Sequence, residues 1–234
     1  MDPRLRQAVA GAHLALEQRV QNYLAQRGLE VSCHRGCFAC CYAWVVVGLA
    51  EAEYLREWLA EHSPEQLAHC EAEGARRLKR IAREKHRPGF ATAYFLEANP
   101  CPLLTPDGGC FGHAHRPLAC RGVLTNLPPR YCAPGAVLAL EGPEKATYQN
   151  QLNPWHGPEH YLKKPWQLSL RTAQRLWATE QHLRGFTVVG ELASLVYLLG
   201  QGAFQRALAS GKEDVYKELS RRRLLEGDFG FWVG

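Results

Sequence analysis

The chain has 234 residues, of which 46% are hydrophobic and 10% aromatic, so it has enough apolar material to bury a core without help from a metal. No stretch of the sequence approaches the ~20 apolar residues of a membrane span, and its first residues lack the apolar region of a secretory signal, so a cytoplasmic protein is expected. Its net charge of +5 is mild and spread along the chain, so charge alone does not indicate nucleic-acid binding.

The first predicted element is an amphipathic helix from Pro3 to about Arg27. Its apolar residues recur every three or four positions, with polar residues between them. Asp2 is placed to cap this helix, Pro3 fits its first turn, and Gly28 fits its end. The helix is therefore expected to lead the chain directly into the cysteines that follow.

Four of the nine cysteines lie within nine residues, in the segment Cys33-His34-Arg35-Gly36-Cys37-Phe38-Ala39-Cys40-Cys41. This C-x3-C-x2-C-C spacing lets several thiolates converge on one soft ion or cluster, and Gly36 supplies the backbone freedom that such a turn needs. A disulfide framework is typical of small secreted chains, and inert core cysteines rarely cluster. The segment is therefore predicted to be a metal-binding loop.

The segment after this run is apolar. Residues 42–47 are rich in β-branched and aromatic side chains and fit either a short strand or a buried connector. No partner strand is obvious in the sequence, which favours the connector. Residues 49–61 then carry apolar side chains at helical spacing, so a helix is expected there.

A further helix is predicted from Pro64 to about His86. Ser63 is its expected N-cap, and Gln66 completes a capping box. Cys70 falls in the middle of this helix, away from the other thiols. It is therefore predicted to be a small core residue rather than a metal ligand.

The end of this helix carries a basic run that is interrupted only by Glu84. The run consists of Arg76, Arg77, Lys79, Arg80, Arg83, Lys85 and Arg87. Such a run indicates either a solvated helix surface or a face that binds nucleic acid or an acidic partner. Aromatic residues are not interleaved with these charges, as nucleic-acid stacking sites require, so the solvated surface is favoured.

A long proline-rich segment follows. Eleven of the 14 prolines lie between Pro100 and Pro165, and the segment shows no sustained helical or strand period. It contains several aromatic residues and the four cysteines Cys101, Cys110, Cys120 and Cys132. Order imposed by a bound metal explains such a segment better than disorder does.

A tight-turn signal, Asp107-Gly108-Gly109, lies within this segment. It is expected to fold Cys101 and Cys110 back toward each other, and Cys120 supplies a third thiol nearby. A mixed Cys/His zinc site is an alternative to a site of thiolates alone. Its histidine candidates, each of which is more often a simple loop residue, are His34, His113 and His115.

Helical patterning returns after Pro165 and predicts helices over residues 165–185, 191–199 and 214–225. The last of these is expected to turn four residues inward, namely Val215, Tyr216, Leu219 and Leu224. The apolar tail over residues 229–233 is expected to pack back on the body, because an exposed patch of this kind promotes aggregation.

The sequence shows no internal repeat and no sharp change of composition. We therefore predict a single domain over residues 1–234, mainly α, in which helices surround a metal site built from long Cys/Pro-rich loops. Residues 33–125 are its predicted cysteine-cluster core, and residues 165–234 are a helical C-terminal extension.

The order of the cysteine motifs resembles the CxxCxxCC cysteine-cluster proteins, a family catalogued as a zinc- or iron-chelating domain and often as iron–sulfur cluster proteins. The resemblance covers residues 33–125. It depends on Cys40-Cys41, on Cys101-Pro102-Leu103-Leu104, and on Cys110 followed by Arg116-Pro117 and Cys120-Arg121. It implies seven metal ligands, namely Cys33, Cys37, Cys40, Cys41, Cys101, Cys110 and Cys120.

The chain departs from the family pattern in two places. Three residues separate Cys33 from Cys37 where the family name has two, and His115 stands where an aromatic residue commonly precedes the Arg-Pro pair. The family looks related to the cysteine-rich part of flagellin lysine methylases, which implies an iron–sulfur enzyme as one outcome. The resemblance does not extend to residues 140–234.

A site of four thiolates suits a tetrahedral zinc ion or an iron–sulfur cluster. The C-x3-C-x2-C portion resembles the spacing that binds three corners of a 4Fe-4S cube, with the fourth ligand supplied by a distant part of the chain. The adjacent Cys40 and Cys41 point in different directions and are not expected to hold the same iron. One four-thiolate site with spare thiols and two metal positions both agree with the count. Arg116 and Arg121 either stabilise the reduced, more negative cluster or lie on a loop surface.

Three functions compete. The favoured one is a metal-binding protein whose thiols hold an iron–sulfur cluster (4Fe-4S), or zinc, for redox chemistry, metal handling or sensing, with a redox or metal-delivery protein as its partner. A second is an iron–sulfur or zinc enzyme of the oxidoreductase or methyl-transfer type, with substrate bound near Trp155, His156, His160 and Tyr161. A third is a structural zinc protein that binds a protein partner or nucleic acid through the basic run.

Nucleotide chemistry is not indicated by this sequence. It contains neither the glycine fingerprint of NAD-binding folds nor the P-loop pattern G-x-x-x-x-G-K-S/T, which argues against NAD and ATP as cofactors. Whether the chain is an enzyme and whether it forms oligomers are not decided by the sequence.

Overall fold

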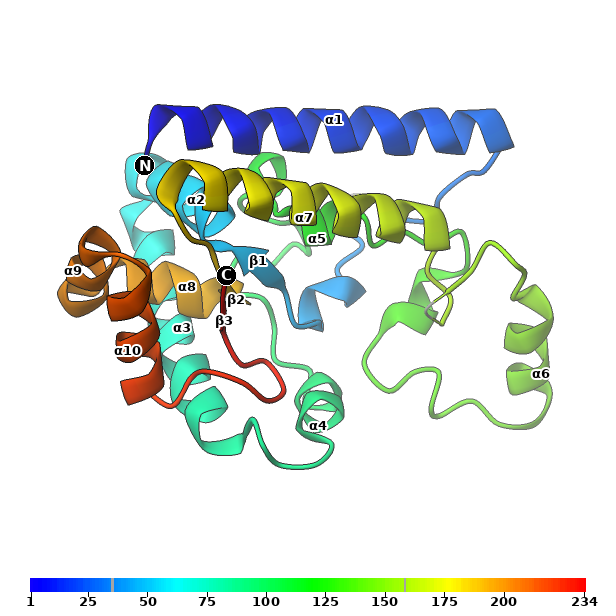
Figure 1. The fold of residues 1–234 in the computed structure, drawn as a ribbon. Helices are drawn as coiled ribbons and strands as arrows, with labels where there is room; N and C mark the ends of the chain where they lie inside the picture. The colour runs from blue at the N-terminus through cyan, green and yellow to red at the C-terminus, as the bar shows by residue number, and fades with distance from the viewer. Residues whose placement is uncertain (35, 158) are drawn as a thin grey trace.

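Helices surround a small sheet in this computed structural model, which describes residues 1–34, 36–157 and 159–234 (Figure 1). Helices, with the 3-10 turns included, make up 61% of the described residues, so the mainly α prediction is confirmed. Among the helices of the described residues, none combines the length and the apolar character that crossing a membrane requires.

Two long helices run side by side along one edge of the molecule, as Figure 1 shows. They are α1 (Pro3–Arg27) and α7 (Lys163–Arg184). Asp2 caps α1 by accepting a hydrogen bond from the Arg4 backbone N–H at 2.7 Å, and Gly28 ends it in the left-handed conformation, as predicted. Together with residues of α2 and α5, the two helices enclose an apolar cluster that includes Val9, Leu16, Val20, Ala50, Leu118, Ala173 and Leu176.

The larger core lies among helices α2 (Leu49–His62), α3 (Pro64–Glu84) and α8 (Leu192–Leu199). The helices α9 (Gly202–Ser210) and α10 (Lys212–Arg221) cover one end of it. Its fully buried members include Leu55, Leu59, Cys70, Ile81, Leu195, Leu198, Phe204 and Val215. The prediction that Cys70 is a core residue is therefore confirmed.

The capping box predicted before α3 forms only in part. The Ser63 hydroxyl accepts a hydrogen bond from the Gln66 backbone N–H at 3.3 Å, so Ser63 is the N-cap. The Gln66 side chain, however, donates to the Pro102 carbonyl at 2.5 Å. This contact ties the start of α3 to the loop that carries Cys101.

The sheet consists of three short antiparallel strands in the order β1-β2-β3. They are β1 (Val46–Gly48), β2 (Val188–Glu191) and β3 (Trp232–Val233). Val47 pairs with Gly190, and Val188 pairs with Val233. The prediction of a connector over residues 42–47 is thus wrong at its C-terminal end, because the partner strand lies far along the chain.

The structure contains several elements that the sequence did not indicate. These are the helices α4 (Phe90–Leu96), α5 (Leu118–Arg121), α6 (Gly142–Gln151) and α9, and the 3-10 turns η1 (Ala39–Tyr42), η2 (His113–His115) and η3 (Pro129–Cys132). The α6 segment forms a lobe to the right in Figure 1. This lobe has a small apolar cluster of its own around Leu127, Tyr131 and Tyr148.

The C-terminal part differs from prediction in its last helix. α10 ends at Arg221, and Tyr216 is exposed rather than turned inward, whereas Leu224 is buried beyond the helix end. The apolar tail packs back on the body as expected. Phe231 is buried, and the Phe229 ring stacks on Trp44 with ring centroids 3.5 Å apart.

Candidate metal centre

The loop after Pro100 lies against the first cysteine run. The Cys101 backbone N–H donates to the Cys41 carbonyl at 2.7 Å. Residues 103–111 then form a narrow hairpin, in which Leu104 pairs with Cys110 and the Phe111 N–H donates to the Leu103 carbonyl at 2.8 Å. The predicted folding of Cys101 and Cys110 toward each other is therefore confirmed.

The tip of this hairpin packs on the middle of the cysteine run. A Cβ atom at Gly108 would lie 2.8 Å from Phe38 Cδ1 and 3.2 Å from the Gly36 carbonyl oxygen, so only glycine permits this approach. Gly36 has a φ of +88°, the backbone freedom predicted for it. Arg35, which precedes it in the run, lies outside the described residues.

Cys120 reaches the same region from α5. The start of this short helix is held by two buried side chains of the surrounding helices. The Glu51 carboxylate of α2 accepts a hydrogen bond from the Leu118 N–H at 2.8 Å, and the Ser169 hydroxyl of α7 donates to the Leu118 carbonyl at 2.7 Å. The helices α2 and α7 thus position Cys120, although α5 is only one short turn within the proline-rich segment.

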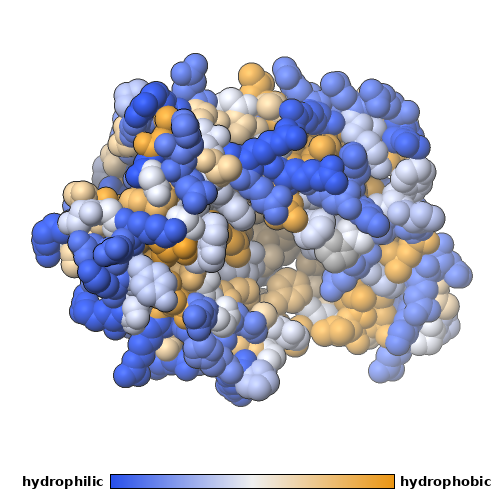
Figure 2. Space-filling view, viewed as in Figure 1, coloured by the Kyte–Doolittle hydropathy of each residue, from blue (hydrophilic) through white to orange (hydrophobic). Residues whose placement is uncertain are grey.

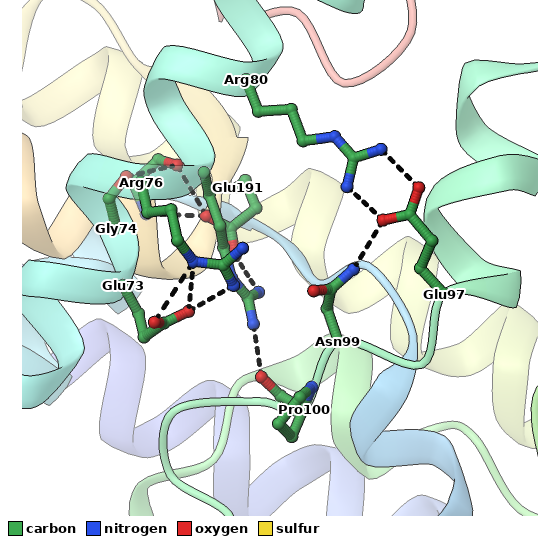
Figure 3. Close-up of polar contacts among 10 residues, drawn as sticks. Glu73, Gly74, Arg76, Arg80, Glu97, Asn99, Pro100 and Glu191 are labelled. Atoms are coloured by element: carbon green, nitrogen blue, oxygen red, sulfur yellow. Dashed lines mark hydrogen bonds and ion pairs between the residues drawn. The ribbon is translucent and has the colours of Figure 1, made fainter.

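A buried ion pair holds the backbone next to Cys101. Arg77 of α3 is 4% exposed and binds the Glu191 carboxylate at 2.9 Å, and its second terminal nitrogen donates to the Pro100 carbonyl at 2.6 Å. Glu191 also caps α8 by accepting hydrogen bonds from the Ser194 N–H and hydroxyl, both at 2.7 Å. Figure 3 shows this network, with Glu191 and Pro100 labelled.

Six of the seven predicted ligands have pKa values that neighbouring thiols help to shift. Burial, together with the charges of Cys101, Cys40 and Cys110, raises the pKa of Cys120. Burial also raises the pKa of Cys33, of Cys110 and, to about 11, of Cys101. All nine cysteines of the chain are free thiols.

The thiols of Cys40 and Cys41 lie within hydrogen-bond distance of each other, so the prediction that they point in different directions is wrong. The Cys41 thiol donates a hydrogen bond to the Cys40 sulfur, which lowers the pKa of Cys40 and raises that of Cys41. Arg116 adds to the effect on Cys40 because its positive charge favours the thiolate. Cys40 is therefore the more acidic of the two thiols.

The two predicted arginines have different surroundings. Burial raises the pKa values of Cys33, Cys110 and Cys120, and the positive charge of Arg116 partly opposes this rise. The same charge helps to lower the pKa of Cys40. Its Nε atom is buried and has no hydrogen-bond acceptor among the described residues. Arg121 is 5% exposed and donates instead to the Arg116 carbonyl at 2.8 Å and the Ala114 carbonyl at 2.5 Å.

Neighbouring thiols do not by themselves make a ligand cage. Within the described residues, no three His, Cys, Asp or Glu side chains are arranged as a metal site. The donor atoms nevertheless suit a soft ion or an iron–sulfur cluster, because cysteine sulfurs predominate among them and become thiolates when they bind metal. Of the alternative histidine ligands, His113 contacts Arg116, and His115 stacks on Trp58 with ring centroids 4.5 Å apart.

An eighth thiol, which was not among the predicted ligands, lies beside this group. Cys132 is 5% exposed, and its sulfur lies 3.3 Å from His160 Nε2. The Tyr161 hydroxyl also hydrogen-bonds to Cys132, while His160 Nδ1 lies 3.3 Å from the Tyr148 hydroxyl. Burial raises the pKa of Cys132 to about 12 and lowers that of His160 to about 4.

The proposed substrate region is split by these contacts. His160 and Tyr161 contact Cys132, whereas Trp155 lies under the Arg27 guanidinium at 4.8 Å and His156 Nε2 lies 2.7 Å from the Asn126 side-chain oxygen. Figure 2 shows that the face below α7 is hollowed, with apolar side chains inside the hollow.

The basic run is not a uniform cationic surface. Ion pairs join Arg76 to Glu73, Arg77 to Glu191 and Arg80 to Glu97. Lys85 is buried and donates to the Leu225 carbonyl, so it holds the C-terminal loop. Lys79, Arg83 and Arg87 remain at the surface.

The function of this chain has to be inferred from its own residues, because comparisons with known proteins found no match. No family model, no curated protein and no solved structure matches this chain.

Proposed function

We propose that this chain is a metal-binding cysteine-cluster protein whose thiols hold an iron–sulfur cluster, or zinc, for redox chemistry, metal handling or sensing. The observation that supports the proposal is that the loop of Cys101 and Cys110 packs on the first cysteine run, while α5 brings Cys120 near Cys40, Cys101 and Cys110. The charge of Arg116 helps to lower the pKa of Cys40 and opposes the burial that raises the pKa values of Cys33, Cys110 and Cys120. The CxxCxxCC resemblance points to the same chemistry.

The surroundings of Arg116 support an anionic group at this position. A buried guanidinium N–H without an acceptor is costly, and its cost is removed when a sulfur carrying negative charge accepts the hydrogen bond. Both a four-thiolate zinc site and a four-thiolate cluster carry that charge. Arg116 would therefore lower the free energy of the loaded, deprotonated state relative to the protonated thiols.

Polar ties from the helices hold the backbone of the thiol-bearing loops. Glu51 and Ser169 fix the first turn of α5, and Arg77 fixes the carbonyl before Cys101. Iron–sulfur clusters supply one-electron chemistry, and zinc supplies a closed structural site. The residues named here bind and orient the thiols in either case.

Metal analysis of protein purified without oxygen tests the proposal. A 4Fe-4S cluster predicts a brown protein with about four iron and four sulfide per chain, and zinc predicts a colourless protein with stoichiometric zinc. Cys120→Ser should lower the metal content, whereas the matched control Cys70→Ala, in the core between α3 and α8, should keep it. A folded wild-type protein that binds neither iron nor zinc would contradict the proposed function.

A further inference from the structure

Cys132 belongs with the thiols at the start of the first run. The turn η3, which ends at Cys132, packs against η1, which begins one residue before Cys40. The Thr125 carbonyl accepts hydrogen bonds from the Ser32 N–H at 2.8 Å and from the Cys33 thiol at 3.9 Å. Cys33 and Cys132 are thus both anchored to the segment over residues 125–132.

The side chain of Thr125 extends this link to the far side of Cys132. Its hydroxyl donates to the His160 carbonyl at 2.8 Å, and the His160 ring lies 3.3 Å from the Cys132 sulfur. His160 is 1% exposed and is fixed through Nδ1 by the Tyr148 hydroxyl. Metal-ligating groups are commonly supported by such hydrogen bonds, which orient a ligand and tune its charge.

The other thiols are connected through a separate set of contacts. Cys101 is bound to the backbone of Cys41, and the hairpin pairing places Cys110 opposite Leu104. Cys120 follows on α5 (Leu118–Arg121), nine residues after the hairpin. The adjacent Cys40 and Cys41 therefore lie where two groups of thiols meet.

We propose that eight thiols form two four-thiolate metal positions that meet between Cys40 and Cys41. The first position is formed by Cys33, Cys37, Cys40 and Cys132. The second is formed by Cys41, Cys101, Cys110 and Cys120. This inference depends on the proposed function, because it divides the same metal-binding region into two centres.

The division accounts for two features of the chain. The first position contains the C-x3-C-x2-C spacing, which provides three ligands of a cluster, and Cys132 is its distant fourth ligand. The adjacent cysteines, whose thiols are hydrogen-bonded to each other, then bind different centres that share this boundary. Each position fits either a soft tetrahedral ion or an iron–sulfur cluster, because both take four thiolates.

The number of metal centres per chain, measured by native mass spectrometry on anaerobically purified protein, tests this division. Wild-type protein should hold two centres, and iron, sulfide and zinc analysis identifies each. Cys132→Ser should lose the first centre alone, Cys120→Ser the second alone, and the double variant both. Cys70→Ala, the control, should keep two. Circular dichroism checks that each variant retains its helices.

A titration of the reduced wild-type protein with cadmium, followed by thiolate-to-metal absorption, avoids any folding defect of the variants. Two ions bound per chain support the division, and one ion overturns it. Full metal content in Cys132→Ser, or loss of all metal from both single variants, also overturns it. A wild-type protein that binds no metal in either measurement rejects the proposed function itself.

Discussion

Apolar burial stabilises the helical body, which comprises α1–α3, α7–α10 and the sheet, whereas the loops that carry the thiols are held mainly by polar contacts. The body contains the two larger apolar clusters. The loops instead receive buried charged or polar side chains from the helices, chiefly Arg77, Glu51 and Ser169. A buried charge is costly unless it is paired, so the loops should be far more sensitive than the body to the loss of one contact.

Metal removal should give the largest difference between the two regions. If thiolate–metal bonds complete the loops, chelation under reducing conditions should accelerate amide hydrogen exchange in residues 33–43 and 101–132 by at least about tenfold, because metal-binding energy is folding energy in such segments. α3 and α8 should keep their protection. Hydrogen-exchange mass spectrometry measures both regions at once, and an equal change in the two would remove the distinction.

Breaking the buried ion pair should have the next largest effect. Arg77→Met leaves the Glu191 carboxylate buried without its partner and should lower the free energy of unfolding by about 3–5 kcal/mol. The neighbouring Arg76, which is half exposed and paired with Glu73, provides the control. Arg76→Met should cost less than about 1 kcal/mol in the same urea titration. Similar costs for the two variants would show that the buried contact has no special role.

The helical body also contains one buried carboxyl group whose pKa is shifted, that of Glu180 in α7. Burial raises the pKa of Glu180 to about 7, although Thr187 and Arg184 partly oppose the shift. The folded state therefore binds the proton more tightly than the unfolded state, so the free energy of unfolding should fall as pH rises from about 4.5 to about 7.

The expected loss over that range is about 2–3 kcal/mol. Glu180→Gln keeps the shape and the Thr187 hydrogen bond but removes the titration. The unfolding free energy of this variant, measured in urea across the same pH range, should not show the decrease that the titration of Glu180 causes in the wild type. A wild-type protein and a variant with identical pH profiles would show that Glu180 titrates normally.

Loss of a helix cap should produce the smallest effect. Ser63→Ala removes the hydroxyl that caps α3 and should lower the free energy of unfolding by about 1 kcal/mol. Ser220→Ala, at an exposed position in α10, should stay within about 0.5 kcal/mol of wild type. A cost of several kcal/mol for Ser63→Ala would mean that the loss of the cap also breaks the hydrogen bond from Gln66 to the Pro102 carbonyl in the Cys101 loop.

The sequence predicted the elements whose signals are local. The limits of α1 and α3 follow from Asp2, Gly28 and Ser63, whose capping depends on neighbouring residues. The hairpin between Cys101 and Cys110 follows from the Asp-Gly-Gly turn in the same way. Such features need no knowledge of the distant chain.

Other features depend on distant partners and could not be predicted in this way. β1 pairs with β2, whose residues lie far along the chain, so the apolar residues of β1 fit a buried connector equally well when only the neighbouring sequence is considered. α4 and α6 are short, and their patterns are too brief to stand out between prolines. The contact of Cys132 with His160 likewise depends on the folding of the α6 lobe. The one signal in the sequence that could have pointed to this contact was Cys132 itself, a cysteine that no motif used.

Arg121 links the surface of α1 to the chemistry of the thiols. It forms an ion pair with Glu17, which is 43% exposed on α1, and it holds the carbonyls of Ala114 and Arg116 on its other side. The backbone of Arg116 is thereby tied to α1 through Arg121. We therefore expect that a substitution at Glu17, on the surface of the first helix, shifts the Arg116 backbone and changes the acidity of the nearby thiols.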